Sequence, residues 1–129
     1  MDRRTFIERI AALVGVGLTG PQTIAAPVQR IELQRSPVAG FQYHEGDAVW
    51  SRLRVGERLD LIREEDNPYD LRAVRVEWRG HQLGYVPRLD NAAVSQLLDN
   101  GQTLRAEIAA LQLSRNPWER IAFTVYMNN

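Results

Sequence analysis

The sequence contains no cysteine and no lysine, and the absence of cysteine excludes several kinds of bond and site. Without cysteine there is no disulfide bond, no thiolate ligand for zinc and no cysteine nucleophile. Histidine is scarce as well, since His44 and His81 are the only two, so we expect no dedicated transition-metal site. The 16 basic residues are all arginine and are balanced by 16 acidic residues. The chain therefore lacks the basic excess typical of proteins that bind nucleic acids through charge alone.

The apolar run near the N-terminus, Ile10 to Leu18, is too short to span a bilayer, which needs about 20 residues. The preceding residues, Asp2 to Ile7 with Arg3-Arg4, resemble a twin-arginine export signal. Small residues before Ala26 suit signal peptidase cleavage there. We therefore expect residues 1–26 to be a twin-arginine-type signal peptide and the folded remainder to reach the periplasm or the cell exterior. A retained N-terminal anchor helix that tethers the chain to a membrane, or an amphipathic N-terminal helix of a cytoplasmic protein, are the alternatives.

The composition of the 129 residues, 44% hydrophobic and 25% charged, is typical of one small soluble domain. Alternating apolar residues predict short strands, and apolar residues at helical spacing predict two short helices, one beginning near Asp47 and one near Asp90 or Asn91. A change of alternation near 109–111 predicts a β-bulge. Six short strands and two helices fit a compact β-barrel. The strands are expected at 38–44, 58–63, 73–78, 82–86, 104–113 and 121–125.

A polar loop, Glu64 to Asp70, separates two of the expected strands. Pro68 suits the second position of a type I turn, and the short side chains of Asn67 and Asp70 can accept hydrogen bonds from nearby backbone amides. In one interpretation the loop is a plain bend and Tyr69 only covers the end of the core. In the other, a ligand stacks on Tyr69 while Asn67 and Asp70 bind its hydroxyl groups. The residues alone leave both interpretations open.

Four blocks of sequence, taken in order, resemble the HIRAN domain over about the last hundred residues, which we delimit as 27–129. The resemblance is to a stand-alone HIRAN domain protein of bacterial type, and it implies a small six-stranded OB/SH3-like β-barrel. It also implies capture of the 3′ end of single-stranded DNA, with the terminal nucleoside in a pocket. The blocks are Val38 to Gly46, Glu64 to Asp70 with its Asn-Pro-Tyr-Asp, Ala73 to Val76, and Leu83 to Pro87.

The residues that match the family's nucleic-acid-binding positions are Gln42 and Tyr43, both expected on strand 38–44, and Asp66, Asn67, Tyr69 and Asp70 in the loop. Stacking on Tyr43 or Tyr69 would contribute about 1 to 3 kcal/mol per base. Asp70 would accept the proton of a free 3′ hydroxyl, because a carboxylate offers only acceptors, and it would repel a 3′ phosphate.

The sequence departs from the family at two of these positions. Gln42 and Asp66 stand where the eukaryotic relatives have arginine and asparagine, so we expect weaker binding than in those relatives. Arg63, Arg72 and Arg88 are candidate phosphate contacts, and each is equally suited to pair with a neighbouring acidic residue.

Two other functions are compatible with the residues. The same loop can serve an exported cell-envelope module that binds protein or glycan. Alternatively, Glu64, Glu65, Asp66 and Asp70 could hold a divalent cation in a metal-dependent hydrolase acting on phosphoesters or acid anhydrides. Because no cation-loop spacing and no general base with a partner is visible, we expect a non-catalytic module without a metal or cofactor.

Overall fold

A computed structural model of the protein describes residues 30–128, so the expected signal segment at 1–26 lies outside the described residues. No helix within this described part is long and apolar enough to cross a membrane. Six strands, two short α-helices and four 3-10 helices follow one another along it. They are β1 (Arg30–Pro37), η1 (Phe41–Tyr43), α1 (Gly46–Val49), η2 (Trp50–Arg52), β2 (Arg58–Glu64), β3 (Ala73–Trp78), β4 (His81–Tyr85), η3 (Arg88–Asp90), α2 (Asn91–Asp99), β5 (Leu104–Leu111), η4 (Pro117–Glu119) and β6 (Ile121–Asn128).

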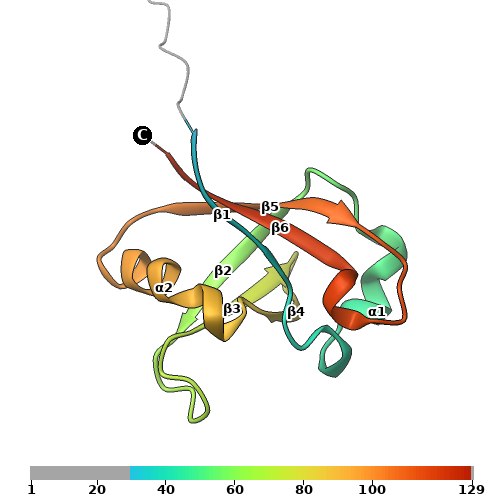
Figure 1. Cartoon of the computed structure of the whole chain (residues 1–129), viewed down its shortest axis with the longest axis horizontal. Helices are drawn as coiled ribbons and strands as arrows, with labels where there is room; N and C mark the ends of the chain where they lie inside the picture. The colour runs from blue at the N-terminus through green and yellow to red at the C-terminus, as the bar shows by residue number, and fades with distance from the viewer. Residues whose placement is uncertain (1–29, 129) are drawn as a thin grey trace, which may run out of the picture.

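The strands form one antiparallel sheet in the order β1-β6-β5-β2-β3-β4 (Figure 1). Strand β2 links its two halves, because Arg58 and Leu59 pair with β5 whereas Asp60 to Glu64 pair with β3. The two edges of the sheet meet at a single bridge, in which Ala39, just after β1, exchanges backbone hydrogen bonds of 2.8 and 2.9 Å with Tyr85 of β4. The expected small, mainly β domain with six strands and two helices is therefore confirmed, although the barrel is not fully closed.

The core fills the space enclosed by the curved sheet. Strand β3 shows how the alternating pattern produces it, because Val74, Val76 and Trp78 are buried while Arg75 and Glu77 between them are partly exposed. Helix α1 and helix α2 lie at opposite ends of the sheet (Figure 1). The largest fully buried side chains are Trp78, Phe41, Phe123, Leu53, Leu59, Leu83, Ile108 and Ile121.

The expected strand at 38–44 is wrong. The first strand is β1, which ends at Pro37, and the chain then turns at Gly40, whose φ of 73° lies in the left-handed region. Val38 and Phe41 are both buried, and a spacing of three residues cannot place two side chains on the same face of a strand. Gln42 and Tyr43, predicted on a strand, therefore lie on the short helix η1.

One finer prediction is confirmed. The register of β5 against β6 shifts between Ile108 and Ala110, where the β-bulge was expected. Helix α2 is followed at Gly101 by a left-handed residue with φ of 83°. Glu45 precedes α1 and Asp90 precedes α2, and neither makes a side-chain cap hydrogen bond.

Candidate functional site

The loop between β2 and β3 is built from consecutive tight turns, in which the amides of Asn67, Asp70 and Ala73 each bond to the carbonyl three residues earlier. The turn expected at 67–70 is thereby confirmed. The Asn67 side chain holds it from inside, because its Oδ1 accepts from the amides of Tyr69 at 2.8 Å and of Asp70 at 3.2 Å. Its Nδ2 donates to Glu64 Oε1 at 3.0 Å. Asn67 therefore shapes the loop.

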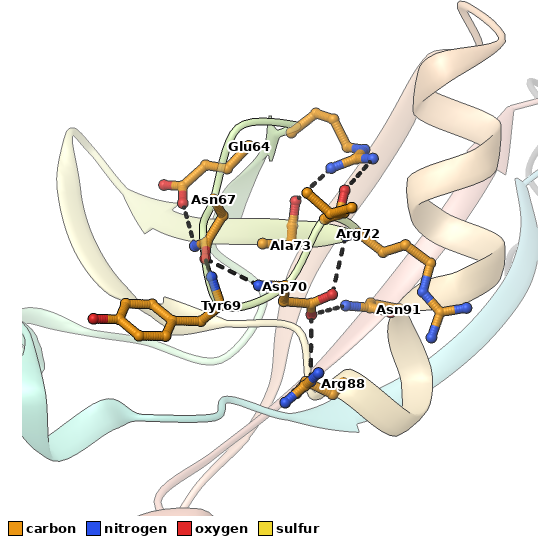
Figure 2. A network of polar contacts seen from close by, with 10 residues as sticks. Glu64, Asn67, Tyr69, Asp70, Arg72, Ala73, Arg88 and Asn91 are labelled. Atoms are coloured by element: carbon orange, nitrogen blue, oxygen red, sulfur yellow. Dashed lines mark hydrogen bonds and ion pairs between the residues drawn. The ribbon is translucent and has the colours of Figure 1, made fainter.

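Asp70 is held by donors from three segments of the chain (Figure 2). Its Oδ1 accepts from the amide of Arg72 at 3.0 Å, and its Oδ2 accepts from Asn91 Nδ2 at 2.8 Å. The guanidinium of Arg88 lies 3.9 Å from the same Oδ2. Asn91 is completely buried at the start of α2, so the carboxylate of Asp70 is fixed in one orientation by a rigid partner.

Glu64 holds the other side of the loop. Its Oε1 accepts from Asn67 and from the Tyr85 hydroxyl, both at 3.0 Å, and its Oε2 lies 2.8 Å from Arg75. Partial burial opposes ionisation of Glu64, but the hydrogen bonds from Asn67 and Tyr85 and the charge of Arg75 outweigh it, so its pKa is lowered. Partial burial, together with the Glu64 carboxylate, raises the pKa of Tyr85, so the phenol stays protonated and donates.

The lowered pKa of Glu64 predicts a loss of stability in acid. Because the group is more acidic in the folded state, its contribution is present above its unfolded pKa and disappears as the pH falls through the folded value. We expect E64Q to lower the free energy of unfolding near neutral pH by about 1 to 2 kcal/mol and to flatten its decline in acid. Urea unfolding of both proteins across this range measures the difference, which should shrink as the pH falls. A difference independent of pH would contradict this assignment.

A cavity of about 510 Å³ opens between this loop, helix η1 and the end of β4. Two tyrosines belong to its lining although they are largely exposed, since Tyr43 is 78% and Tyr69 85% accessible. Figure 2 shows the Tyr69 ring projecting away from the hydrogen-bonded part of the loop. Exposed aromatic faces beside a hollow can stack on a flat ligand. The lining residues are Ala39, Gly40, Tyr43, His44, Asn67, Tyr69, Asp70, Ala73, Tyr85, Val86 and Arg88.

The structure brings most of the predicted site residues together around this cavity. Tyr43, Asn67, Tyr69, Asp70 and Arg88 all line it. Gln42 and Asp66 are exposed and are not among the lining residues.

The other two candidate arginines do not line the cavity. Arg63 donates to the carbonyls of Leu71 and Ala73 and pairs with Asp99 at 3.0 Å, so its guanidinium holds the loop against α2. Arg72 is exposed. Of the arginines in the described part of the chain, Arg88 is thus the one that faces the cavity, with a side chain 77% accessible.

Three important residues were not predicted to belong to the site. His44 and Tyr85 line the cavity, and their rings meet edge to face with centroids 5.6 Å apart. Both lie in blocks that carry the family resemblance, which was the available signal. No signal in the sequence indicated Asn91, because its contact with Asp70 joins residues 21 positions apart.

Within residues 30–128 no three histidine or acidic side chains lie close enough together to hold a metal ion. Glu64 and Asp70 are each engaged with their own hydrogen-bond donors, and Glu65 and Asp66 are exposed. In this part of the chain the acidic residues of the loop are therefore not gathered into one cluster.

The sheet and the tyrosine-lined cavity define a small, mainly β, OB-like domain. Residues 31–128 match the HIRAN domain, and the chain belongs to that family. A segment of 67 residues is 36% identical to the helicase-like transcription factor of Mus musculus; the match covers 51% of this chain and 6% of that protein. The chain thus spans a small fraction of the length of this relative.

Two solved structures are similar. A protein from Lactobacillus plantarum has a TM-score of 0.68 at 28% identity, over 79% of this chain and 98% of that one. The HIRAN domain of human HLTF has a TM-score of 0.61 at 20% identity, over 78% of this chain and 79% of that one. At this identity the similarity supports a shared fold and nothing more.

Proposed function

We propose that this protein is a non-catalytic nucleic-acid-binding module that captures the 3′ end of single-stranded DNA or a nucleoside-like ligand in the cavity described above. The observation that carries the proposal is the cavity itself, with two exposed tyrosine rings at its surface and the fixed carboxylate of Asp70 in its wall. Membership of the HIRAN family supports it, as does similarity to a protein named as helicase-like and a transcription factor.

In the proposed complex each group has a role. A base would stack on Tyr43 or Tyr69, whose faces are already exposed, so little rearrangement is needed. The carboxylate of Asp70 would accept the proton of a 3′ hydroxyl, since each of its oxygens retains a lone pair beyond the contacts that fix it. A 3′ phosphate in the same place would meet a negative charge.

Phosphate contacts would be few. Among the arginines at positions 30–128, Arg88 alone lines the cavity, and Arg63 is occupied by the loop and Asp99. Each neutralised phosphate of a single strand contributes about −0.7 to the slope of log affinity against log salt. We therefore expect modest affinity with a shallow salt dependence, and recognition that rests on the terminal nucleoside.

A titration of the protein with labelled oligothymidine tests the proposal. Strands that end in a 3′ hydroxyl are compared with strands that end in a 3′ phosphate, at low and at moderate salt. We expect the hydroxyl end to bind about tenfold more tightly or better. Equal binding would eliminate end recognition, and no binding at low salt would favour the protein or glycan alternative. Added magnesium or manganese should yield no cleaved product, and a product would support the hydrolase.

The tyrosine contribution is tested with a matched pair of variants in one loop. Y69A removes a ring that lines the cavity, whereas L71A removes an apolar side chain that is also largely exposed but does not line it. We expect Y69A to weaken binding about five- to hundredfold and L71A to leave it unchanged. Both residues are largely exposed, so neither change should lower the thermal unfolding temperature much. Equal effects on binding would show that the loop acts only through its backbone.

Export through a twin-arginine-type signal and the stand-alone bacterial type stay predictions of the sequence, and we propose both on that basis. The ligand is then one that reaches the periplasm or the cell exterior, such as free DNA or nucleosides.

A further inference from the structure

The two histidines of the chain lie in contrasting environments. His44 lines the cavity and is partly buried, with its ring against Tyr85. His81 lies outside the cavity, where its Nδ1 is 2.9 Å from Glu45 Oε1 and its ring stacks on Trp78. One histidine is therefore available to a ligand, and the other already has a carboxylate partner.

Within residues 30–128 the ring of His44 makes no hydrogen bond or ion pair. Each charged group around it has another partner, although the Glu45 carboxylate also attracts a charged His44. Glu45, its neighbour in sequence, binds His81, and Asp47 of α1 binds Arg120 at 2.8 Å. Tyr85 is neutral and donates to Glu64, whose charge is offset by Arg75. At the cavity, Asp70 and Arg88 form the remaining pair of opposite charges.

We infer that His44 is a ligand-contacting residue whose protonated ring provides a second positive charge in the cavity, beside Arg88, for the phosphodiester next to the terminal nucleoside. The inference rests on the proposed function, because it needs a ligand with a phosphodiester. An imidazolium donates from both ring nitrogens and forms charge-assisted hydrogen bonds to phosphate oxygens. Histidine offers this charge only at the acidic end of the range between about pH 5 and pH 8.

Binding of a strand should therefore tighten as the pH falls. For oligothymidine with a 3′ hydroxyl end, we expect the dissociation constant at about pH 5.5 to be three- to tenfold lower than at about pH 7.5. Thymine and the phosphodiester do not titrate in this interval, so the ligand contributes no change of charge. The lowered pKa of Glu64 keeps its carboxyl group ionised throughout this interval.

The histidines supply a matched pair of variants. H81Q removes the histidine outside the cavity and should retain the full pH dependence, whereas H44Q should abolish it. H44R keeps a positive charge at every pH and should bind at about pH 7.5 as tightly as the unaltered protein does at about pH 5.5. Thermal unfolding of each variant shows whether the fold is intact, and the restoration by arginine would not arise from a purely structural role of His44.

Proton uptake provides an independent readout. Calorimetry in two buffers of different ionisation enthalpy should show that a fraction of a proton is taken up when the strand binds to the unaltered protein or to H81Q, and none with H44Q. Binding that is measurable but independent of pH would overturn the inference and leave the proposed function standing. The absence of strand binding at both pH values would overturn the proposed function itself.

Discussion

Replacing Gly84 with alanine is expected to lower the free energy of unfolding by about 3 kcal/mol or more. A Cβ atom at this position would lie 2.2 Å from the carbonyl oxygen of Ala39 and 2.7 Å from a methyl group of Val38. Val38 is buried, and Ala39 makes the bridge to Tyr85 that joins the two edges of the sheet. The added methyl group can be accommodated only if this bridge opens.

Urea denaturation measures this loss, and G101A is the control. Gly101 has a positive φ of 83°, but a Cβ there would meet nothing within 4 Å, so G101A should cost about 1 kcal/mol through backbone conformation alone. The excess in G84A is then the steric contribution. Ala39 and Tyr85 both line the cavity, so the folded G84A protein should also bind strands more weakly. Equal losses in the two variants would contradict this view of the bridge.

The strands were predictable where a single face of each strand is buried. In β3 the alternation of Val74 and Val76 with Arg75 and Glu77 is local information, and it reflects the burial that the structure shows. The segment after β1 was not predictable in this way. Phe41 is drawn into the core against Trp50, with ring centroids 5.9 Å apart, and Gly40 allows the turn that places it there. That choice depends on packing between distant segments, which alternation does not encode.

In the candidate site, too, some features follow from local residues and others from tertiary contacts. The turn at 67–70 follows from Pro68 and the short side chain of Asn67, both of which act within the loop. The orientation of Asp70 does not, because Asn91 fixes it from the first turn of α2. Similarly, the chemistry of Arg63 suits a phosphate contact, but Arg63 pairs with Asp99, 36 residues away in the sequence. Local chemistry thus indicates which residues can bind a ligand, and tertiary contacts decide which remain available.

Replacing Asp70 with asparagine is expected to abolish the preference for a 3′ hydroxyl over a 3′ phosphate. The same change should lower the free energy of unfolding by about 1 to 3 kcal/mol. From the sequence, asparagine would be a nearly equivalent turn cap, but in the structure both oxygens of Asp70 accept from fixed donors, the amide of Arg72 and Nδ2 of Asn91. An asparagine at 70 has no negative charge to strengthen these two hydrogen bonds, and its NH₂ group faces Nδ2 of Asn91 unless the Asn91 amide, whose Oδ1 has no partner within residues 30–128, turns over. The two end-labelled strands and urea denaturation measure the two effects.

A reciprocal exchange separates binding from stability. In N91D alone, two carboxylates would face each other where Asn91 Nδ2 and Asp70 Oδ2 are now 2.8 Å apart, which should destabilise the fold strongly. In D70N/N91D, the asparagine at 70 can accept from the amide of Arg72 and donate to the aspartate at 91, which also lies in the favourable first turn of α2. The double variant should therefore lose less stability than the two single variants predict together, by about 1 to 3 kcal/mol.

End preference should nevertheless stay lost in D70N/N91D. The exchange keeps the net charge of the network but moves the carboxylate from Asp70, which lines the cavity, to position 91, which is buried and does not. If the preference for a 3′ hydroxyl returns in the double variant, it follows the total charge of the network and not an acceptor placed at the ligand. If D70N alone retains the preference, Asp70 acts only as a structural part of the loop, and end recognition must come from another group in the cavity.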